Sequence, residues 1–532
     1  MGSPVFGRDG EAGSADRPVF DVLRWASNRS SSLAAAAFAF VVYAPLAGRR
    51  SAWSDDFPFL LDKDLLITGS VDDGRPVLGL VNRLVLGSAD TIGDLAVPRL
   101  LGVIGIAALI GYLAAELRKL DWSASSATLI ACSIALLPPF HGYAGWATVF
   151  SYPWFILLGA WSGSLWVEAV HLRSWMRAAL GFGCFLIAML AYPPAAMFCW
   201  AVLGIRHASR PVALPSMFRE ALAMGCLVVG SGVVAIGVGK VVMGALDVEP
   251  TRFGVVESLP ELVEKMVWFL THPVVVAARP FIILSPGEVV AVLTAGPVLA
   301  LILVGLAISR SGAPGNRLAA VGLLLTVSAL TMTAHLVSVD NQIEYRFMAG
   351  IVVLTWVYIV VAVRAVYRRL MAERTAGRWV GAVGVPVLLV VVTVATWMAW
   401  TNVHQVFVGP AEVKEEYLVD HLGEFDPDQH DRIVVLQPAD GWPSRSNLGI
   451  FSSRTVLWHS WVVEPNVTLL LTERFGRADG PEVLATYEPT ELGHGDFGLD
   501  LRPLRNRLCL NLARWWAVKS GIHPAGSWRS SS

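Results

Sequence analysis

Two pairs of acidic residues lie close to the first long apolar stretch of this chain. Asp55 and Asp56 belong to the segment Trp53-Ser54-Asp55-Asp56-Phe57, and Asp72 and Asp73 begin the segment Asp72-Asp73-Gly74-Arg75-Pro76. Carboxylates near a bilayer lose hydration and feel each other's field, so they are held there mainly to bind a cation or to accept a proton. We therefore predict a chemical role for the first pair, with a solvated loop or a helix cap as the alternative. The second pair is equally compatible with a site or with a turn that caps the helix beginning at Pro76.

The composition places these acids in a multi-pass membrane protein. Of 532 residues, 55% are hydrophobic and only 16% are charged, and the mean hydropathy is +0.56. The net charge of -1, with basic residues spread over many short loops, gives no argument for a nucleic-acid partner. Four of the five cysteines lie in apolar stretches, so neither a disulfide framework nor a CxxC metal site is predicted.

Spanning helices of about 20 apolar residues are predicted in nine places. These segments are 32–48, 98–116, 124–139, 148–170, 219–244, 287–308, 318–338, 346–363 and 379–401. The stretch 178–205 is too short for two full crossings, yet arginines flank both its ends, so the chain must enter and return. Tyr192-Pro193-Pro194 lies near its middle, which predicts two short or re-entrant helices and a total of about eleven.

The positive-inside rule then gives the predicted organisation. Residues 1–31 form a cytoplasmic tail, residues 32–401 a transmembrane domain with outer loops 49–97 and 245–286, and residues 402–532 a small extracytoplasmic α/β domain. The expected location is the plasma (inner) membrane. Arg49 and Arg50 contradict this pattern, because they follow the first span on its outer side, and we interpret them as functional or lipid-facing.

Several segments outside the spans have recognisable periodicity. Helices lying on the membrane are predicted from Phe57 onward, over 76–85 and over 259–270, where they could wall a cavity at the outer leaflet. In the C-terminal domain we predict a helix over 410–423 and strands at 433–436 and 467–471.

Other residues on the predicted outer side could bind a substrate. A departing phosphate needs a cation, and Arg346 in Asn341-Gln342-Ile343-Glu344-Tyr345-Arg346 is the first choice, with Arg75, Arg83 and Lys240 as further candidates. Arg346 and Lys240 are equally able to extend to the interface without a chemical role. Tyr345, His141 and Tyr152 are further candidates, although His141 and Tyr152 also suit an aromatic belt at helix ends.

The position of Asp55-Asp56 directly after the first span, followed by Asp72-Asp73-Gly74-Arg75-Pro76, resembles the GT-C superfamily of membrane glycosyltransferases. Within it, the chain is most similar to the O-antigen glucosyltransferase type, over about 400 residues of the membrane part. The resemblance implies a polyprenyl-phosphate-linked sugar donor, transfer on the outer face, and Asp55 or Asp56 as the base. No matching motif occurs in the C-terminal domain.

This chemistry suits the residues. A polyprenyl phosphate is already a good leaving group, so one carboxylate that takes the proton of an acceptor hydroxyl is the main requirement. Direct displacement with the base opposite the phosphate predicts inversion at the anomeric carbon. The second aspartate could hold the base or help to bind Mg²⁺ or Mn²⁺, which leaves a divalent cofactor open.

We therefore predict an enzyme that moves a sugar to a cell-envelope glycan or lipid acceptor. A lipid-sugar transporter or flippase is the first alternative, but the predicted spans carry few charges at mid-bilayer. A polysaccharide ligase or polymerase would rely on arginines and a histidine in a large late outer loop, whereas 339–345 is short. A scaffold or sensor would leave the early acids unexplained.

Overall fold

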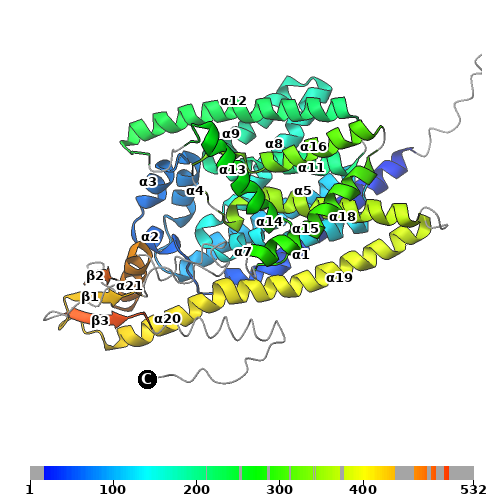
Figure 1. Ribbon diagram of the computed structural model, residues 1–532. Coiled ribbons are helices and arrows are strands. Elements are labelled where there is room, and N and C mark those ends of the chain that lie inside the picture. Colours follow the sequence, from blue (N-terminus) through cyan, green and yellow to red (C-terminus); the bar gives the residue numbers. More distant parts are fainter. Residues whose placement is uncertain are drawn as a thin grey trace, which may run out of the picture.

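The computed structural model describes residues 17–210, 212–250, 255–283, 288–310, 313–339, 341, 343–371, 377–437, 460–475, 481–486 and 496–502. Its helices begin with α1 (Arg17–Ala47), α2 (Asp56–Leu61), α3 (Leu65–Val71), α4 (Pro76–Leu86), α5 (Ala96–Lys119), α6 (Ala124–Ala135), α7 (Pro138–Gly145), α8 (Tyr152–Leu172), α9 (Trp175–Ala191), α10 (Pro193–Ala196) and α11 (Phe198–Ser209) (Figure 1). They continue with α12 (Leu214–Leu246), α13 (Leu259–Thr271), α14 (Pro273–Ala277), α15 (Glu288–Ser309), α16 (Pro314–Leu330), α17 (Thr333–Val337), α18 (Ala349–Met371), α19 (Gly377–Val403), α20 (Gly409–His421) and α21 (Ser460–Phe475).

Within these described residues, seven helices are long and apolar enough to cross a membrane. They are Arg29–Ala47, Gly93–Lys119, Ala147–Leu172, Leu214–Leu246, Val290–Ser309, Ala349–Leu370 and Val383–Val403. An eighth is obtained if α6 and α7, which are bent by 61° at their junction, count as one span. The protein is thus a helical protein with membrane-spanning character, while the predicted count of about eleven spans is not confirmed.

The difference from eleven arises where helices are short or broken. The stretch 178–205 forms α9 and α11 on either side of Tyr192, as the two prolines predict. The predicted span 318–338 is divided into α16 and α17 at Thr331 and Met332. The predicted tail, residues 1–31, also differs where the structure describes it. Residues 17–31 belong to α1, which begins at Arg17, and residues 1–16 lie outside the described residues.

Small residues let some of these helices approach closely, as in the crossing of α15 and α18. A Cβ built on Gly305 would overlap the Cβ and the Cα of Ala362. Contacts this short cannot be relieved by rotating a side chain, because they involve the backbone of the neighbouring helix. Gly305 is therefore required for the distance between the two helices.

We expect Gly305→Ala to lower stability by about 1–3 kcal/mol, because the added methyl forces α15 and α18 apart. Gly296→Ala in the same helix is the matched control, since no atom lies within 4 Å of its built Cβ. The measurement is thermal unfolding of both purified variants in detergent. Equal transition temperatures for the two variants would contradict the close crossing.

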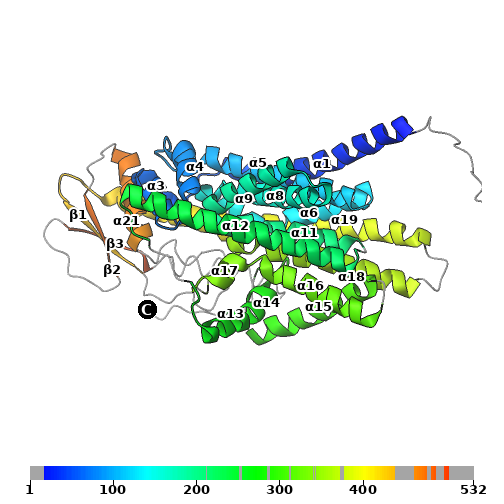
Figure 2. The same ribbon diagram turned by 90° about the horizontal axis from the view of Figure 1, so that it is seen from above.

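The charged residues divide between the two ends of the helical bundle. One end, which we call the arginine end, joins the ends of α5, α11, α15 and α18: Arg210 pairs with Asp121 at 2.9 Å, Arg310 donates to the carbonyl of His207 at 2.6 Å, and Arg364 lies over Trp122. The other, the carboxylate end, holds α2, α3, α20, α21 and the sheet (Figure 1), and Figure 2 shows α3, α21 and the sheet together at that end. This separation agrees with the predicted two-sided charge distribution.

The C-terminal region is an α/β unit attached to the last long helix. A π-helical turn at His404–Val408, labelled η4, joins α19 to α20. Strands β1 (Arg432–Leu436), β2 (Glu482–Thr486) and β3 (Asp496–Asp500) form a parallel sheet in the order β2-β1-β3, with Val434 opposite Leu484 and Gly498. The predicted strand at 433–436 and the helix over 410–423 are both present.

The second predicted strand, 467–471, is wrong, because these residues belong to α21. Val463, Val467 and Leu470 are buried at helical spacing, and α21 packs on β2 and on α2. A short apolar run is compatible with either a buried strand or a buried helix face. Only the surface it packs against decides between them.

The C-terminal unit shares a hydrophobic core with the predicted first outer loop, residues 49–97. Phe57 and Leu86 from the loop belong to the same buried cluster as Tyr417, Val435 and Leu470. Beside this core, Arg50 pairs with Glu415 at 2.7 Å and with Glu473 at 2.5 Å, and Arg49 lies 3.5 Å from Glu412. The arginine pair that contradicted the charge pattern therefore contacts acids of α20 and α21.

Candidate functional site

The segment that carries Asp55 and Asp56 is fixed by a buried arginine of α5. Arg99 donates to the carbonyls of Leu46 (3.4 Å) and Arg49 and to the hydroxyl of Ser51 at 3.1 Å. It thereby holds the segment that follows α1, where the carbonyl of Leu46 also accepts from the amide of Arg49 at 3.1 Å. Ser54 then adopts a left-handed conformation with φ 44°, which is uncommon for a residue with a side chain. This turn directs the two neighbouring aspartates differently.

Asp56 points into the protein and acts as a backbone cap. Its carboxylate oxygens accept hydrogen bonds from the backbone amides of Trp53 at 2.8 Å and Thr148 at 2.9 Å, and the residue is 1% exposed. Burial raises the pKa of Asp56 to about 7, although both amides oppose that shift. A carboxyl group enclosed in this way joins the first outer loop to the loop before α8, and a substrate hydroxyl has no access to it.

Asp55 points toward a cation instead. Its side chain is 33% exposed, and Oδ2 lies 4.0 Å from Nη1 of Arg346. Oδ1 accepts a hydrogen bond from the hydroxyl of Ser54 at 3.2 Å. The structure thus separates the two predicted catalytic acids, and Asp55 is the one that solvent or a ligand can reach.

Arg346 lies in a short 3₁₀ turn, Tyr345–Phe347, directly before α18. Its guanidinium group lies 4.7 Å from the ring centroid of Trp146 and 4.8 Å from that of Phe347, and it pairs with Glu344. The phenol of Tyr143 donates to the Arg346 carbonyl at 2.6 Å. Burial alone would lower the pKa of Arg346, but the charge of Glu344 and of other neighbours holds it above its ordinary value. The group is therefore a fixed, permanently charged donor.

A second arginine and a group of tyrosines lie beside this pair. Arg75, at the start of α4, pairs with Asp73 at 3.2 Å and lies 5.4 Å from the ring centroid of Tyr192. Tyr192 in turn stacks on Tyr152, with centroids 3.8 Å apart. The charges of Arg75 and Arg346 both act on these two phenols. Two cations, three carboxylates and a stacked aromatic pair are thus brought together from five parts of the sequence.

Several predicted residues lie apart from this group or point elsewhere. Arg83 donates to the carbonyl of Lys63 at 3.1 Å on the exposed side of α4, and Lys240 is exposed on α12. His141 is buried and bonds to the carbonyl of Leu136 at 3.1 Å, where α6 and α7 meet. The phenol of Tyr345 contacts the carbonyl of Ile282 at 3.4 Å instead of the arginine beside it. Asp72 ends α3, where its backbone amide donates to Thr68.

Other members of the group were not predicted. Glu344, Tyr143, Tyr192 and Trp146 contact Arg346 or the tyrosine stack, and Lys265 of α13 donates to Asn341 at 2.8 Å. The ring of His335 lies 4.7 Å from that of Phe347, within the electrostatic influence of Arg75, Lys265 and Arg346. The one signal available in the sequence was Tyr192, which precedes the two prolines at the predicted helix break.

The geometry does not fit a metal ion shared by Asp55 and Asp56. Both oxygens of Asp56 are occupied by backbone amides, and its side chain points away from Asp55's ion pair. Among the described residues, no three His, Cys, Asp or Glu side chains converge as metal ligands. We derive no chemical step through a metal.

The buried acid has a titratable neighbour in the C-terminal unit. Lys414 of α20 is 3% exposed, and its Nζ lies 4.0 Å from the ring centroid of Phe57, the residue after Asp56. Burial lowers the pKa of Lys414 to about 7, against the opposing influence of Glu415 and Asp56. Two groups on opposite sides of one interface therefore titrate near neutral pH.

We expect these two groups to give opposite pH dependences of stability. Because the folded-state pKa of Asp56 is raised, its contribution to stability decreases as the pH rises from about 4 to about 7. Because the folded-state pKa of Lys414 is lowered, the contribution of Lys414 to stability increases as the pH rises from about 7 to about 10. Asp56→Asn should remove the loss of stability as the pH rises toward 7, and Lys414→Met should remove the gain as the pH rises above 7. The measurement is the unfolding temperature of each variant relative to wild type at pH 5, 7 and 9. Profiles parallel to wild type for both variants would disprove the assignment.

Comparison with known proteins does not assign this site to a family. A scan against protein-family models found no match, and a search of curated proteins found none either.

Proposed function

We propose that this chain is an integral-membrane inverting glycosyltransferase that moves a sugar from a polyprenyl-phosphate donor to a cell-envelope glycan or lipid acceptor. The observation that carries the proposal is the partly exposed Asp55 carboxylate, 4.0 Å from the Arg346 guanidinium. This pair offers a proton acceptor and an anion-binding group side by side, which are the two functions that the reaction requires.

The proposed reaction is a single displacement. Asp55 takes the proton of the acceptor hydroxyl while the hydroxyl oxygen forms a bond to the anomeric carbon. The bond between that carbon and the phosphate oxygen breaks, and the phosphate leaves with the electron pair. Arg346 and Arg75 stabilise its developing charge. Attack from the side opposite the phosphate inverts the anomeric carbon.

The position of the site along the helices supports a lipid-borne donor. Two residues separate Arg346 from the start of α18, and seven residues separate Asp55 from the end of α1, so both lie near helix ends. The phosphate of a polyprenyl lipid resides at this boundary, while its chain lies along the apolar helices. The buried Tyr152–Tyr192 stack lies beside Arg75 and helps to hold its guanidinium group in place.

The test is transfer from radiolabelled polyprenyl-phosphate hexoses and pentoses by the full chain in proteoliposomes, with an envelope glycolipid extract as acceptor. The expected result is label on the acceptor, with inverted anomeric configuration by NMR. Movement of labelled lipid across the bilayer without transfer would favour the flippase and overturn the proposal.

We expect the transfer to persist in excess EDTA. The two aspartates do not form a shared ion site, and the arginines supply positive charge where a metal would otherwise be needed. The measurement is initial rate with EDTA and after adding back Mg²⁺ or Mn²⁺. A loss of activity that is restored by either ion would show that a metal acts in the reaction.

A further inference from the structure

A cavity lies at the arginine end of the bundle, far along the helices from Asp55. Its volume is about 80 Å³, which is room for several water molecules or one small polar headgroup. Residues near the ends of α5, α8 and α11 form most of its lining, and Ile134 and Met224 complete it. None of these residues takes part in the site proposed above.

The depth of the cavity matches that of lipid headgroups. The candidate span on α5 ends at Lys119, that on α8 ends at Leu172, and α11 ends at Ser209. Most of the lining residues come from the C-terminal halves of these three helices. Leu113, Leu117 and Val202 are among the cavity's apolar lining residues. A cavity of this form opens where hydrocarbon gives way to water.

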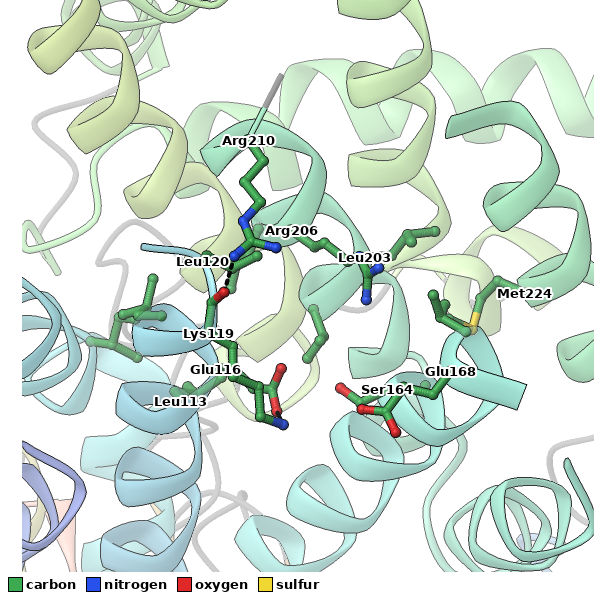
Figure 3. Close-up of a pocket in the computed structure, with 16 residues that line it drawn as sticks. Leu113, Glu116, Lys119, Leu120, Ser164, Glu168, Leu203, Arg206, Arg210 and Met224 are labelled. Atoms are coloured by element: carbon green, nitrogen blue, oxygen red, sulfur yellow. Dashed lines mark hydrogen bonds and ion pairs between the residues drawn. The ribbon is translucent and has the colours of Figure 1, made fainter. Parts of the chain in front are cut away.

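Opposite charges face one another across the cavity. Figure 3 shows Arg206 and Arg210 on one side and Glu116 and Glu168 on the other. The acids that pair with the arginines do not line the cavity: Arg206 lies 3.5 Å from Glu220 and Arg210 lies 2.9 Å from Asp121. Arg210 also donates to the backbone carbonyl of Lys119, a lining residue.

The two glutamates are likewise paired along their own side, not across the cavity. Glu116 pairs with Lys119 at 2.6 Å, and Glu168 pairs with Arg177 at 2.8 Å. Their side chains remain 14% and 38% exposed. Among the described residues, no ion pair joins the two arginines to the two glutamates. The space between the charged sides is therefore suited to a molecule that carries both charges.

We propose that this cavity binds the headgroup of a phospholipid that contains both a phosphate and a primary ammonium, such as phosphatidylethanolamine. Arg206 and Arg210 offer planar guanidinium donors for the phosphate oxygens. Glu116 and Glu168 accept hydrogen bonds from the ammonium, and the acyl chains stay outside the cavity against the apolar helices. An anionic lipid would satisfy only the arginines. Basic pockets between transmembrane helices are established sites for lipid headgroups, and here the carboxylates add selectivity.

The test uses the full-length protein in nanodiscs that contain equal amounts of phosphatidylethanolamine, phosphatidylcholine and phosphatidylglycerol. Native mass spectrometry then measures the lipid retained after release. The expected result is one retained phosphatidylethanolamine per chain, at least tenfold enriched over phosphatidylcholine, whose quaternary ammonium has no N–H donors. Equal retention of the three lipids would overturn the proposal.

Variants on the two sides of the cavity test phosphate binding and ammonium binding separately. The double variant Arg206→Gln and Arg210→Gln should reduce retention of every phosphate lipid. Glu116→Gln with Glu168→Gln should reduce only the preference for phosphatidylethanolamine over phosphatidylglycerol. Arg173→Gln is the matched control, because Arg173 is an exposed arginine at the same end that does not line the cavity. A preference unchanged in the glutamate variant, with its thermal unfolding equal to wild type, would refute the role of the carboxylates.

Soluble competitors distinguish the headgroup from its components. Glycerophosphoethanolamine at millimolar concentration should displace labelled phosphatidylethanolamine, since the headgroup carries both charges. Equal displacement by inorganic phosphate would instead show a simple anion site and contradict the proposal.

Discussion

Asp55→Asn is expected to lower the rate of sugar transfer by about 10²–10⁴-fold, the usual contribution of a single general base. Asparagine keeps the shape of the side chain and its contact with Ser54, but it cannot take the proton of an acceptor hydroxyl. Because Asp55 is partly exposed, we expect the unfolding temperature to stay at its wild-type value. The measurements are initial transfer rates and thermal unfolding in the same detergent.

Asp56→Asn is the matched control for this prediction. It should lower stability, whereas Asp55→Asn should lower the transfer rate. One oxygen of Asp56 would become an amide nitrogen facing a backbone N–H, so one of the bonds from Trp53 or Thr148 would be lost. We expect about 1–3 kcal/mol less stability. A fully stable Asp55→Asn protein with normal turnover would remove Asp55 from the reaction.

The second large effect is expected at Arg346. Arg346→Gln should reduce the transfer rate by about 10²–10³-fold, as for the loss of one donor to a developing oxyanion. Arg346→Lys should recover only part of this loss, because an ammonium keeps the charge but not the planar stacking between Trp146 and Phe347. Rates are compared at saturating donor, so that weaker binding is separated from slower chemistry.

One control variant and one kinetic comparison make the Arg346 result interpretable. Arg83→Gln removes a cation from the same end of the bundle, but its side chain contacts the carbonyl of Lys63 away from the site. It should transfer sugar at the wild-type rate. If Arg83→Gln and Arg346→Gln reduced the rate equally, a general loss of positive charge would be responsible. An Arg346→Gln variant with unchanged kcat and a raised KM would show that Arg346 acts only in substrate binding.

Local patterns in the sequence were sufficient for the elements that surround the site. Proline at the start of α4, and at the break between α9 and α11, has the same effect in any fold, because it lacks an amide hydrogen and fixes φ. The amphipathic helix α13 was predicted from its periodicity to within one residue at its C-terminus. The run 433–436 also forms the predicted strand, because β2 and β3 pair with it on both sides.

The roles of the two aspartates could not be separated by such patterns. Asp55 and Asp56 are identical side chains one residue apart, and the turn at Ser54 makes them point to different surroundings. The partners of Asp56 are the backbone amides of Trp53 and Thr148, and a backbone amide has no sequence signature. Long-range packing of the loop before α8 is what buries this residue.

The same reason explains the charged contacts between distant segments. Arg49 and Arg50 looked misplaced beside an outer helix end, because the acids that pair with them lie more than 360 residues later in the chain. The 467–471 run formed a helix because α2 and β2 offered it a surface to pack on.

The sequence by itself determined a helical membrane protein with acids and an arginine next to its apolar segments, since composition and periodicity follow from each residue's own transfer free energy and backbone preference. Tertiary structure alone decided that Asp55, Arg346, Arg75 and the Tyr152–Tyr192 stack lie together, and that Asp56 lies inside. These outcomes depend on which distant surfaces fill the space around each side chain, and that information is held by no single segment.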